Sequence, residues 1–596
     1  MALSRLNPFK DFKVTNHTPM NFIIFTDPIG ANSLAQTYTD VNVLLLHNGK
    51  HPWEVSRDIL SNPTATRPHA FNARYQHKAL GAYKLAHECR LAGFTVQVVD
   101  NTSAMDVETL KRVVDKYVGE ETLAMGKSNT FSVKMPWTLN ALPIEYPFVP
   151  LDGATDLDKL FNPFPGAKDH GFLPHGKELD DEFVNYVKGI NPNVKFITGG
   201  AFTREDAEYS NTDFINVGWG DVTLPGLLTR LRDGTANELP VHTKHPYTLD
   251  TISKIEMEHS SMEFIQSDVV IQGEPLPLET ARGCIFKCKF CNFGLLGKEK
   301  GSYFKSCENI KAEIEHNYYE LGVTDYWIVE DTFNDDHEKI IRLHEIITNL
   351  PFKIQFTCYL RLDLLYANRN QPVPQHQLLL EMGLKHVEFG IETTNPESAK
   401  DIGKGLHPEI QFSFLRELRD KHGWEDMVLS SGFIVGLPSD TIESLAKMSK
   451  FLLSTNTVLD RIAIRPLRLD PVTLNPALDS RDSSEFSRNW QDYGYTLIGT
   501  NTGGSPNYIN KNGLTLADCE KFCKNINIRS EGRLQSLFEV ELKAKGLAFP
   551  TITALQFSPG EWDGSKKHQQ RLTEMQRSKI LHYIKTLLTQ DINYET

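Results

Sequence analysis

Apolar and polar positions alternate along the first 240 residues in a way that predicts helices and strands in succession. An apolar run at 22–25 is followed, from Leu80 to Arg90, by apolar residues at every third or fourth position, the spacing of a helix with one buried face. FTVQVVD, KFITGG and DFINVGWGD are typical of strands, and further helices are predicted at EFVNYVKGI and from about Thr223. This alternation predicts a doubly wound, Rossmann-like or flavodoxin-like parallel sheet, with ligands at the carboxyl ends of its strands.

A second alternating region extends from about residue 270 to 475. DYWIVED, KIQFTCYLRLD, KHVEFGIETTN, VLSSGFIVGLPSDT and DRIAIRPLRLDP are each typical of a strand that ends in polar residues or glycine. Helical stretches such as 308–321 separate them. With the short strand expected before residue 284, these units predict a partial (β/α)6 TIM-type barrel, whose site lies where the strands end.

The last 120 residues are mainly helical in pattern. The final helix carries Met575, Ile580, Ile584, Leu587 and Leu588 on one side, so we expect it to pack on the barrel or to cap a substrate. The sequence therefore predicts an N-terminal extension (1–20), an α/β domain with insertions (21–240), the barrel (270–475) and a mainly helical C-terminal region (476–596).

Composition and charge narrow the function further. Of the 596 residues, 40% are hydrophobic, which is enough for several packed cores. The 63 basic and 76 acidic residues give a net charge of -13, which argues against a non-specific nucleic-acid binder. The N-terminus lacks the apolar stretch of a signal peptide and no segment is apolar enough to span a membrane, so we expect a cytoplasmic protein without a membrane partner.

Three of the eight cysteines are close together. ETARGCIFKCKFCNF places Cys284, Cys288 and Cys291 in a C-x3-C-x2-C spacing. Three thiolates in one loop suit an iron–sulfur cluster. A zinc site would need a fourth ligand, for which Cys307 and His316 are nearest, and it usually has a second cysteine knuckle, which the sequence lacks.

This loop resembles the signature of the radical S-adenosylmethionine (radical SAM) superfamily, which has an aromatic residue, here Phe290, before the last cysteine. The resemblance implies a 4Fe-4S cluster with one iron left open. That iron would hold S-adenosylmethionine, and reduction would cleave it to methionine and a 5′-deoxyadenosyl radical.

The later strand ends match further motifs of the superfamily. Glu330 and Asp331 resemble the motif that approaches the methionine amino group, Glu392 the acid near the ribose, and Gly436 the glycine against which adenine packs. Arg361 would pair with the substrate, with the methionine carboxylate or with an acid at the rim. Any one of these acids could instead cap the following helix.

The α/β domain before the loop resembles the cobalamin-binding branch of the superfamily. The resemblance rests on paired glycines at strand ends, Gly199 with Gly200 and Gly218 with Gly220, followed by Asp221 where Glu is usual. Tight turns at strand ends would also explain these glycines. Residues 27–30 (DPIG) lack the histidine that ligates cobalt in some cobalamin proteins, so a bound corrin would have no such ligand, and a domain without corrin stays possible.

The resemblance implies a radical SAM enzyme that transfers a methyl group from cobalamin to an unactivated carbon. The alternatives are radical cyclisation or rearrangement without cobalamin, and a non-catalytic scaffold that binds a cluster. An electron donor such as flavodoxin or ferredoxin is the expected partner, with an unknown small molecule or peptide as substrate. Cys519 and Cys523 are expected to be core residues rather than ligands of a second cluster.

Overall fold

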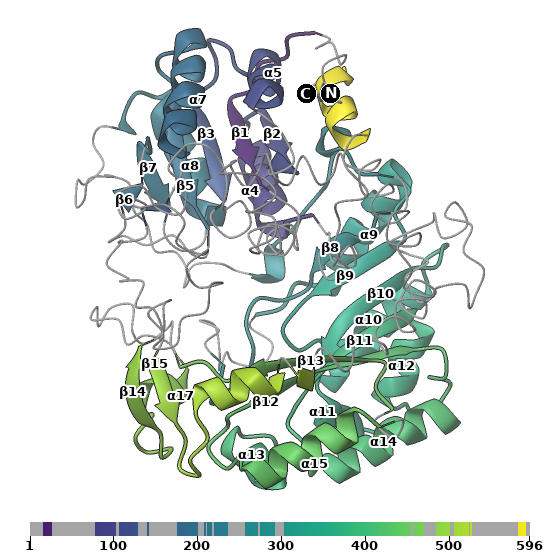
Figure 1. Cartoon of the computed structure of the whole chain (residues 1–596). Coiled ribbons are helices and arrows are strands. Elements are labelled where there is room, and N and C mark those ends of the chain that lie inside the picture. Colours follow the sequence, from purple (N-terminus) through teal and green to yellow (C-terminus); the bar gives the residue numbers. More distant parts are fainter. Residues whose placement is uncertain are drawn as a thin grey trace, which may run out of the picture.

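The computed structural model describes most of the barrel and a large part of the sheet domain (Figure 1). The described residues are 16–26, 78–102, 107–128, 140–141, 176–200, 208–209, 211–216, 220–236, 257–271, 274–291, 303–454, 458–469, 484–500, 506–523, 525–526 and 582–591.

The N-terminal domain is built on a parallel sheet with the strand order β2-β1-β3-β5-β7. Its strands are β1 (Phe22–Phe25), β2 (Val96–Val99), β3 (Ala124–Ser128), β5 (Lys195–Gly199) and β7 (Phe214–Asn216). Counted along the chain, this is the 2-1-3-4-5 order of flavodoxin-like folds, which reverses between β1 and β3. The predicted doubly wound sheet is confirmed. A separate antiparallel pair joins β4 (Asn140–Ala141) and β6 (Glu208–Tyr209).

Helices cover both faces of this sheet because side chains of each strand alternate between them. Phe22 and Ile24 of β1 join one core cluster with α4 (Leu80–Leu91) and α8 (Gly220–Arg232). Ile23 and Phe25 join another cluster with α5 (Val107–Tyr117) and α7 (Gly176–Ile190).

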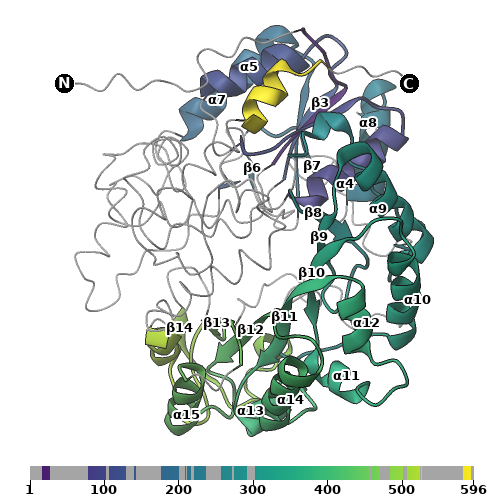
Figure 2. The same ribbon diagram turned by 90° about the vertical axis from the view of Figure 1, so that its right-hand side faces the viewer.

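The C-terminal helix, 582–589, lies against the same face as α5 and α7 (Figure 2). Tyr117 Oη donates to the Leu587 carbonyl at 2.6 Å, and the Asp100 amide donates to Tyr583 Oη at 2.8 Å. The expectation that the last helix packs on the barrel is therefore wrong. The apolar residues Ile584, Leu587 and Leu588 predict that one face of the helix is buried, but they do not identify the surface that covers it. Met575 and Ile580 lie outside the described residues.

The second sheet is parallel and has the order β13-β12-β11-β10-β9-β8, which confirms the partial barrel. Its strands are β8 (Leu276–Glu279), β9 (Asp325–Val329), β10 (Gln355–Leu360), β11 (Leu384–Glu392), β12 (Val428–Val435) and β13 (Arg461–Pro466). The helices between them are α9 (Cys307–Leu321), α10 (His337–Thr348), α11 (Leu362–Ala367), α12 (Gln375–Glu381), α13 (Pro396–Asp401), α14 (Pro408–Lys421) and α15 (Ile442–Leu452).

Local sequence fixes the ends of these helices. The Ser306 hydroxyl accepts from the Asn309 amide at the start of α9, and Gly322 ends that helix with a φ of 68°. Side-chain oxygens of Asp336 and Thr441 cap α10 and α15 in the same way. These caps fix where α9, α10 and α15 begin, and Gly322 fixes where α9 ends.

The two regions share one continuous core. The cluster that contains α4 and α8 extends through Leu276 and Leu278 of β8 into the barrel. The linker before β8 contributes the 3-10 turns η6 (Met257–His259) and η7 (Gln266–Asp268). The sheet domain is therefore packed directly against the first barrel strand.

The described part of the C-terminal region contains α17 (Glu485–Arg488), an antiparallel pair of β14 (Thr496–Thr500) and β15 (Pro506–Ile509), and a helix at 516–523. It follows the barrel as a small layer beside β12 and β13 (Figure 1). Strands thus accompany the expected helices in this region.

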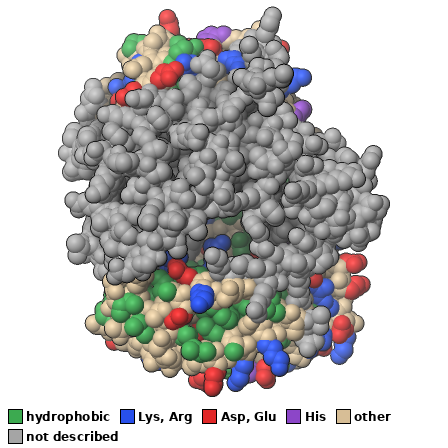
Figure 3. All heavy atoms as spheres, viewed as in Figure 1, with side chains coloured by type: hydrophobic (Ala, Val, Ile, Leu, Met, Phe, Trp, Pro, Cys, Tyr) green, Lys and Arg blue, Asp and Glu red, His purple; other side chains and the backbone are tan. Residues whose placement is uncertain are grey.

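The described residues that are visible in Figure 3 show mixed charge. On the face in Figure 3, acidic and basic side chains are interspersed over the barrel rather than gathered in one basic patch. Among the described residues, no helix combines the length and the apolarity that crossing a membrane would take.

Candidate functional site

The cysteine loop begins directly after β8. The Arg282 amide donates to the Tyr303 carbonyl at 3.0 Å, and the Cys291 amide donates to the Cys288 carbonyl at 3.0 Å, which closes a turn. Cys284 is buried, whereas Cys288 and Cys291 are partly exposed. Burial raises the pKa of the Cys284 thiol, whose sulfur lies 3.5 Å from Thr332 Oγ1.

The donor set fits an iron–sulfur cluster. Among the described residues, no three His, Cys, Asp or Glu side chains lie close enough together to ligate one metal ion. A cluster does not need such convergence, because each of its three thiolates binds a different iron. The three cysteines in one loop therefore suit a cluster better than a single zinc ion.

Arg361 lies against the cysteine loop. Its Nη1 is 3.6 Å from Cys288 Sγ, and its guanidinium stacks over the Phe286 ring at 3.9 Å. Its Nε and Nη2 donate to the Asp363 carboxylate at 3.0 Å and 2.5 Å. The acid partner that sequence analysis considered is present, but Arg361 also brings a positive charge to the loop, where it would stabilise a thiolate.

Glu330 and Asp331 point to different environments, as neighbours after a strand do. Glu330 is buried and accepts from Thr280 Oγ1 at 2.6 Å and from Lys339 Nζ at 2.5 Å. Asp331 is open to solvent but surrounded by protein on most sides; this partial burial, and then the charge of Glu330, raises its pKa to about 7. Asp331 is thus the accessible acid, while both Glu330 oxygens are engaged in structure.

Glu392 has an unusual backbone. Its φ is 70°, and the pairing of β11 with β12 shifts between Phe389 and Glu392, which marks a bulge. A Cβ on Gly390 would lie 2.9 Å from Glu392 Oε1, so the carboxylate folds back over that glycine. Burial raises the pKa of Glu392, which the Lys404 and Arg361 charges oppose. Strain at a half-buried carboxylate is typical of a functional residue.

Gly436 is required by its surroundings. Its φ is 92°, and a Cβ there would lie 2.4 Å from Tyr508 Oη and 2.9 Å from Cys519 Sγ. Tyr495 Oη donates to the Gly436 carbonyl at 3.0 Å. The side of Gly436 where a Cβ would stand is thus filled by the C-terminal region.

The C-terminal region also contacts the cysteine loop. The Phe486 amide donates to the Lys289 carbonyl at 3.0 Å, and the Phe290 ring packs in the same apolar cluster as Tyr495 and Tyr508. This contact was not predicted from the sequence. The aromatic residues of YGYTLIG and PNYI are the feature of the sequence that could have indicated it.

The remaining cysteines have other roles. Cys519 and Cys523 are buried, and burial raises the pKa of each to about 12, as expected of core thiols. Cys307 is buried at the start of α9, and the His316 ring lies 2.8 Å from the Phe264 carbonyl. Cys307 and His316 were the candidates for a fourth zinc ligand. These contacts place neither of them at the cysteine loop.

The inward positions of the barrel hold a polar and aromatic set that sequence analysis did not single out. Tyr359 of β10 is opposite Glu388 of β11, and its ring lies 5.7 Å from that of Trp327. Tyr359 is 43% exposed, yet partial burial and the charges of Glu388 and Asp331 raise its pKa to about 12, which the Arg465 charge opposes. These side chains line the accessible interior beyond the cysteine loop.

The glycines of the sheet domain have different surroundings. Gly199 and Gly200 lie at the carboxyl end of β5, where Gly200 has a φ of 112°. A Cβ on Gly220 would lie 2.8 Å from Leu85 Cδ2, so close packing of α8 on α4 explains this glycine. Gly218 and residues 27–30 lie outside the described residues.

The edge of the sheet carries one further polar group. Thr26 follows β1 at the point where the strand order reverses, and it is fully buried. Its hydroxyl has no hydrogen-bond partner among the described residues. A buried hydroxyl of this kind is suited to a polar ligand group at the switch point.

Comparison with known proteins gives the class of the barrel. Residues 278–452 match the family model of the Radical SAM superfamily. Over 284 residues the chain is 26% identical to an uncharacterised methyltransferase of Pyrococcus horikoshii, which covers 44% of this chain and 59% of that protein. The alignment therefore spans less than two thirds of that relative.

Two solved structures are similar at low identity. TsrM, a radical S-adenosylmethionine methyltransferase from Kitasatospora setae, was solved with its substrate tryptophan and an analogue of S-adenosylmethionine bound. It is 14% identical, with 80% of this chain and 78% of that chain covered and a TM-score of 0.46. OxsB, a cobalamin-dependent S-adenosylmethionine radical enzyme, is 14% identical, with 95% and 80% covered and a TM-score of 0.49.

The matched segment, which begins in β8 and ends with α15, is a radical SAM domain. The cofactors that this superfamily implies are a 4Fe-4S cluster and S-adenosylmethionine.

Proposed function

We propose that the protein is a cobalamin-dependent radical SAM methyltransferase that modifies an unactivated carbon. One observation supports the proposal most strongly. The cysteine loop, Arg361 and the accessible Asp331 lie together in one barrel, and a parallel sheet with the strand order of flavodoxin packs beside that barrel. Two similar proteins are described as methyltransferases, and OxsB was solved with aqua-cobalamin bound.

In the barrel, Cys284, Cys288 and Cys291 would ligate the cluster, which when bound supplies the electron that cleaves S-adenosylmethionine. Asp331 would accept from the methionine amino group, because it is accessible and close to the cysteine loop. Arg361 would balance negative charge beside Cys288, and Glu392 would accept from the ribose. Glu330 would hold Lys339 and the strand ends in place rather than touch the cofactor.

In the sheet domain, cobalamin would bind at the carboxyl edge, where Thr26 offers a buried hydroxyl and Gly199 and Gly200 add no side chain. We assign this role to the domain at 21–240, cofactor cleavage to the barrel at 270–475, and support of the loop to the region at 476–596. Flavodoxin or ferredoxin would supply the electron. The cytoplasmic location stays a prediction.

The experiment uses the full chain, reconstituted anaerobically with iron and sulfide. After reduction with dithionite, 5′-deoxyadenosine should form from S-adenosylmethionine, and hydroxocobalamin should co-elute with the protein in gel filtration. Cleavage without corrin binding would favour radical cyclisation or rearrangement. A cluster without any cleavage would leave only the scaffold.

A further inference from the structure

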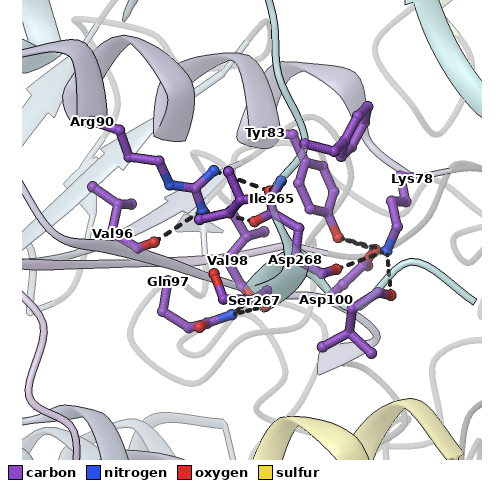
Figure 4. Close-up of polar contacts among 12 residues, drawn as sticks. Lys78, Tyr83, Arg90, Val96, Gln97, Val98, Asp100, Ile265, Ser267 and Asp268 are labelled. Carbon is purple, nitrogen blue, oxygen red and sulfur yellow. Dashed lines mark hydrogen bonds and ion pairs between the residues drawn. The ribbon is translucent and has the colours of Figure 1, made fainter. Parts of the chain in front are cut away.

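Strand β8, which leads into the cysteine loop, is fixed to the sheet domain upstream by a buried polar network (Figure 4). Asp268 of η7 is fully buried and accepts from Arg90 Nη1 at 3.0 Å and Nη2 at 2.7 Å. Lys78 Nζ donates to the carbonyls of Asp268 and Val269, each at 3.2 Å. These contacts join α4 of the sheet domain to the linker before the barrel.

A second set of charges joins the two regions downstream of β8. Arg282 donates through Nε to Glu279 Oε1 at 2.5 Å and through Nη2 to Glu279 Oε2 at 3.0 Å. The same Nη2 lies 2.8 Å from Asp221 Oδ1 in the first turn of α8. The side chains are only 9% exposed for Arg282, 6% for Glu279 and 11% for Asp221, so this Asp221–Arg282–Glu279 bridge is largely shielded from water.

The position of the bridge in the chain matters. Arg282 precedes Cys284 by a single residue, Gly283, and Glu279 ends β8. The backbone between them is held on the other side, since the Lys305 amide donates to the Thr280 carbonyl at 2.8 Å. A segment fixed at this many points has little freedom, so a shift of the α8 terminus would be passed to the cysteine loop.

Stability alone is a poor reason for such a bridge. Burying an ion pair costs desolvation that its attraction often only offsets, and apolar residues of similar volume would pack as well. The core that joins α4, α8 and β8 already buries apolar side chains at this junction. A charged bridge adds a defined geometry, because the guanidinium holds two carboxylates in fixed directions.

We propose that Asp221 and Arg282 are positioning residues that set the cysteine loop relative to the sheet domain. Asp221 belongs to the segment that carries the glycine motif of that domain, so the ion pair links this segment to the residue two positions before Cys284. This inference rests on the cluster and S-adenosylmethionine of the barrel and does not require that cobalamin binds.

The test replaces Asp221 by Asn in the full chain and uses Asp268→Asn as the matched control, because Asp268 of η7 forms a buried bridge to Arg90 upstream of β8. After reconstitution, Asp221→Asn should retain its iron, change the paramagnetic resonance spectrum of the reduced cluster, and weaken S-adenosylmethionine binding about tenfold, as loss of an outer-shell partner does. Asp221→Glu, which restores the charge, should recover both properties. Asp268→Asn should lower the melting temperature at least as much without changing the spectrum or the affinity.

The proposal is overturned if Asp221→Asn has the wild-type spectrum and affinity, or if Asp268→Asn alters them equally. Should Asp221→Asn fail to fold, Arg282→Lys keeps a charge but cannot span both carboxylates, and the same two outcomes decide. A protein that passes this test but binds no corrin would refute the methyl-transfer proposal alone.

Discussion

The barrel and the sheet domain are both built on parallel sheets, and in both regions acids and glycines follow the strands. These residues have different contacts in the two regions. In the barrel, Asp331 lies near Cys284, and Glu392 lies near Arg361, which contacts the cysteine loop. In the sheet domain, Asp221 pairs with an arginine of the other region. A polar residue after a strand therefore indicates a binding edge of the sheet. The packing around the residue shows whether its partner is a cofactor or another part of the protein.

The largest effect should separate two acids at the ends of barrel strands β9 and β11. Glu330→Gln removes one of the two buried carboxylates that pair with Lys339, the other being Asp335, so we expect a loss of about 3 kcal/mol in unfolding free energy. Glu392→Gln should instead leave the melting temperature nearly unchanged and weaken S-adenosylmethionine binding about tenfold. Thermal melts and calorimetry check both, and the comparison fails if Glu392→Gln leaves the affinity unchanged.

The next effect compares a glycine from each region. Gly436→Ala places a Cβ against Tyr508 Oη and Cys519 Sγ at a positive φ, so we expect a loss of about 3 kcal/mol. Gly220→Ala meets the flexible end of Leu85 closely and Asn216 Nδ2 only at 3.6 Å, so its loss should be about 1 kcal/mol.

Denaturant titration measures both glycine variants. Removing the Tyr508 hydroxyl in Gly436→Ala/Tyr508→Phe should return part of the lost stability. If both single glycine variants lose the same unfolding free energy, the proposed difference in packing between the two regions is contradicted.

The sequence predicts more of the fold than of the site. Alternating apolar positions were enough for both sheets and the order of their helices, because each strand must bury its faces. The docking of Tyr583 on Asp100 and the contact of Phe486 with Lys289 could not be predicted, since each joins residues far apart in the chain. The three cysteines were recognisable because a cluster demands their spacing, whereas Asp331 and Glu330 differ only in the direction of their side chains.

A smaller effect concerns acid stability at the junction. Burial, and then the charges of Lys84 and Arg90, lower the pKa of His87 to about 4, and its ring lies 3.1 Å from Ser261 Oγ of the linker. The neutral ring is favoured in the folded state, so stability is complete above pH 6.5 and is lost as pH falls towards 4. His87→Asn should remove about 2 kcal/mol of this loss at pH 5.

His376 of the barrel is the control for that effect. Burial, followed by the charge of His422, lowers its pKa to about 4 as well. His376→Asn should improve acid stability similarly, while hydrogen exchange of the linker at pH 5 should slow only in His87→Asn. If both variants protect the linker equally, acid does not loosen the junction through His87.

The most direct test of the account is the iron content of cysteine variants of the full chain after anaerobic reconstitution. The wild type should hold about four irons per chain. Replacing Cys284, Cys288 and Cys291 by Ala should abolish the cluster and its visible absorption, whereas replacing Cys519 and Cys523 by Ala should leave the cluster intact. Retention of the full iron content by the triple variant would contradict the assignment of the cysteine loop.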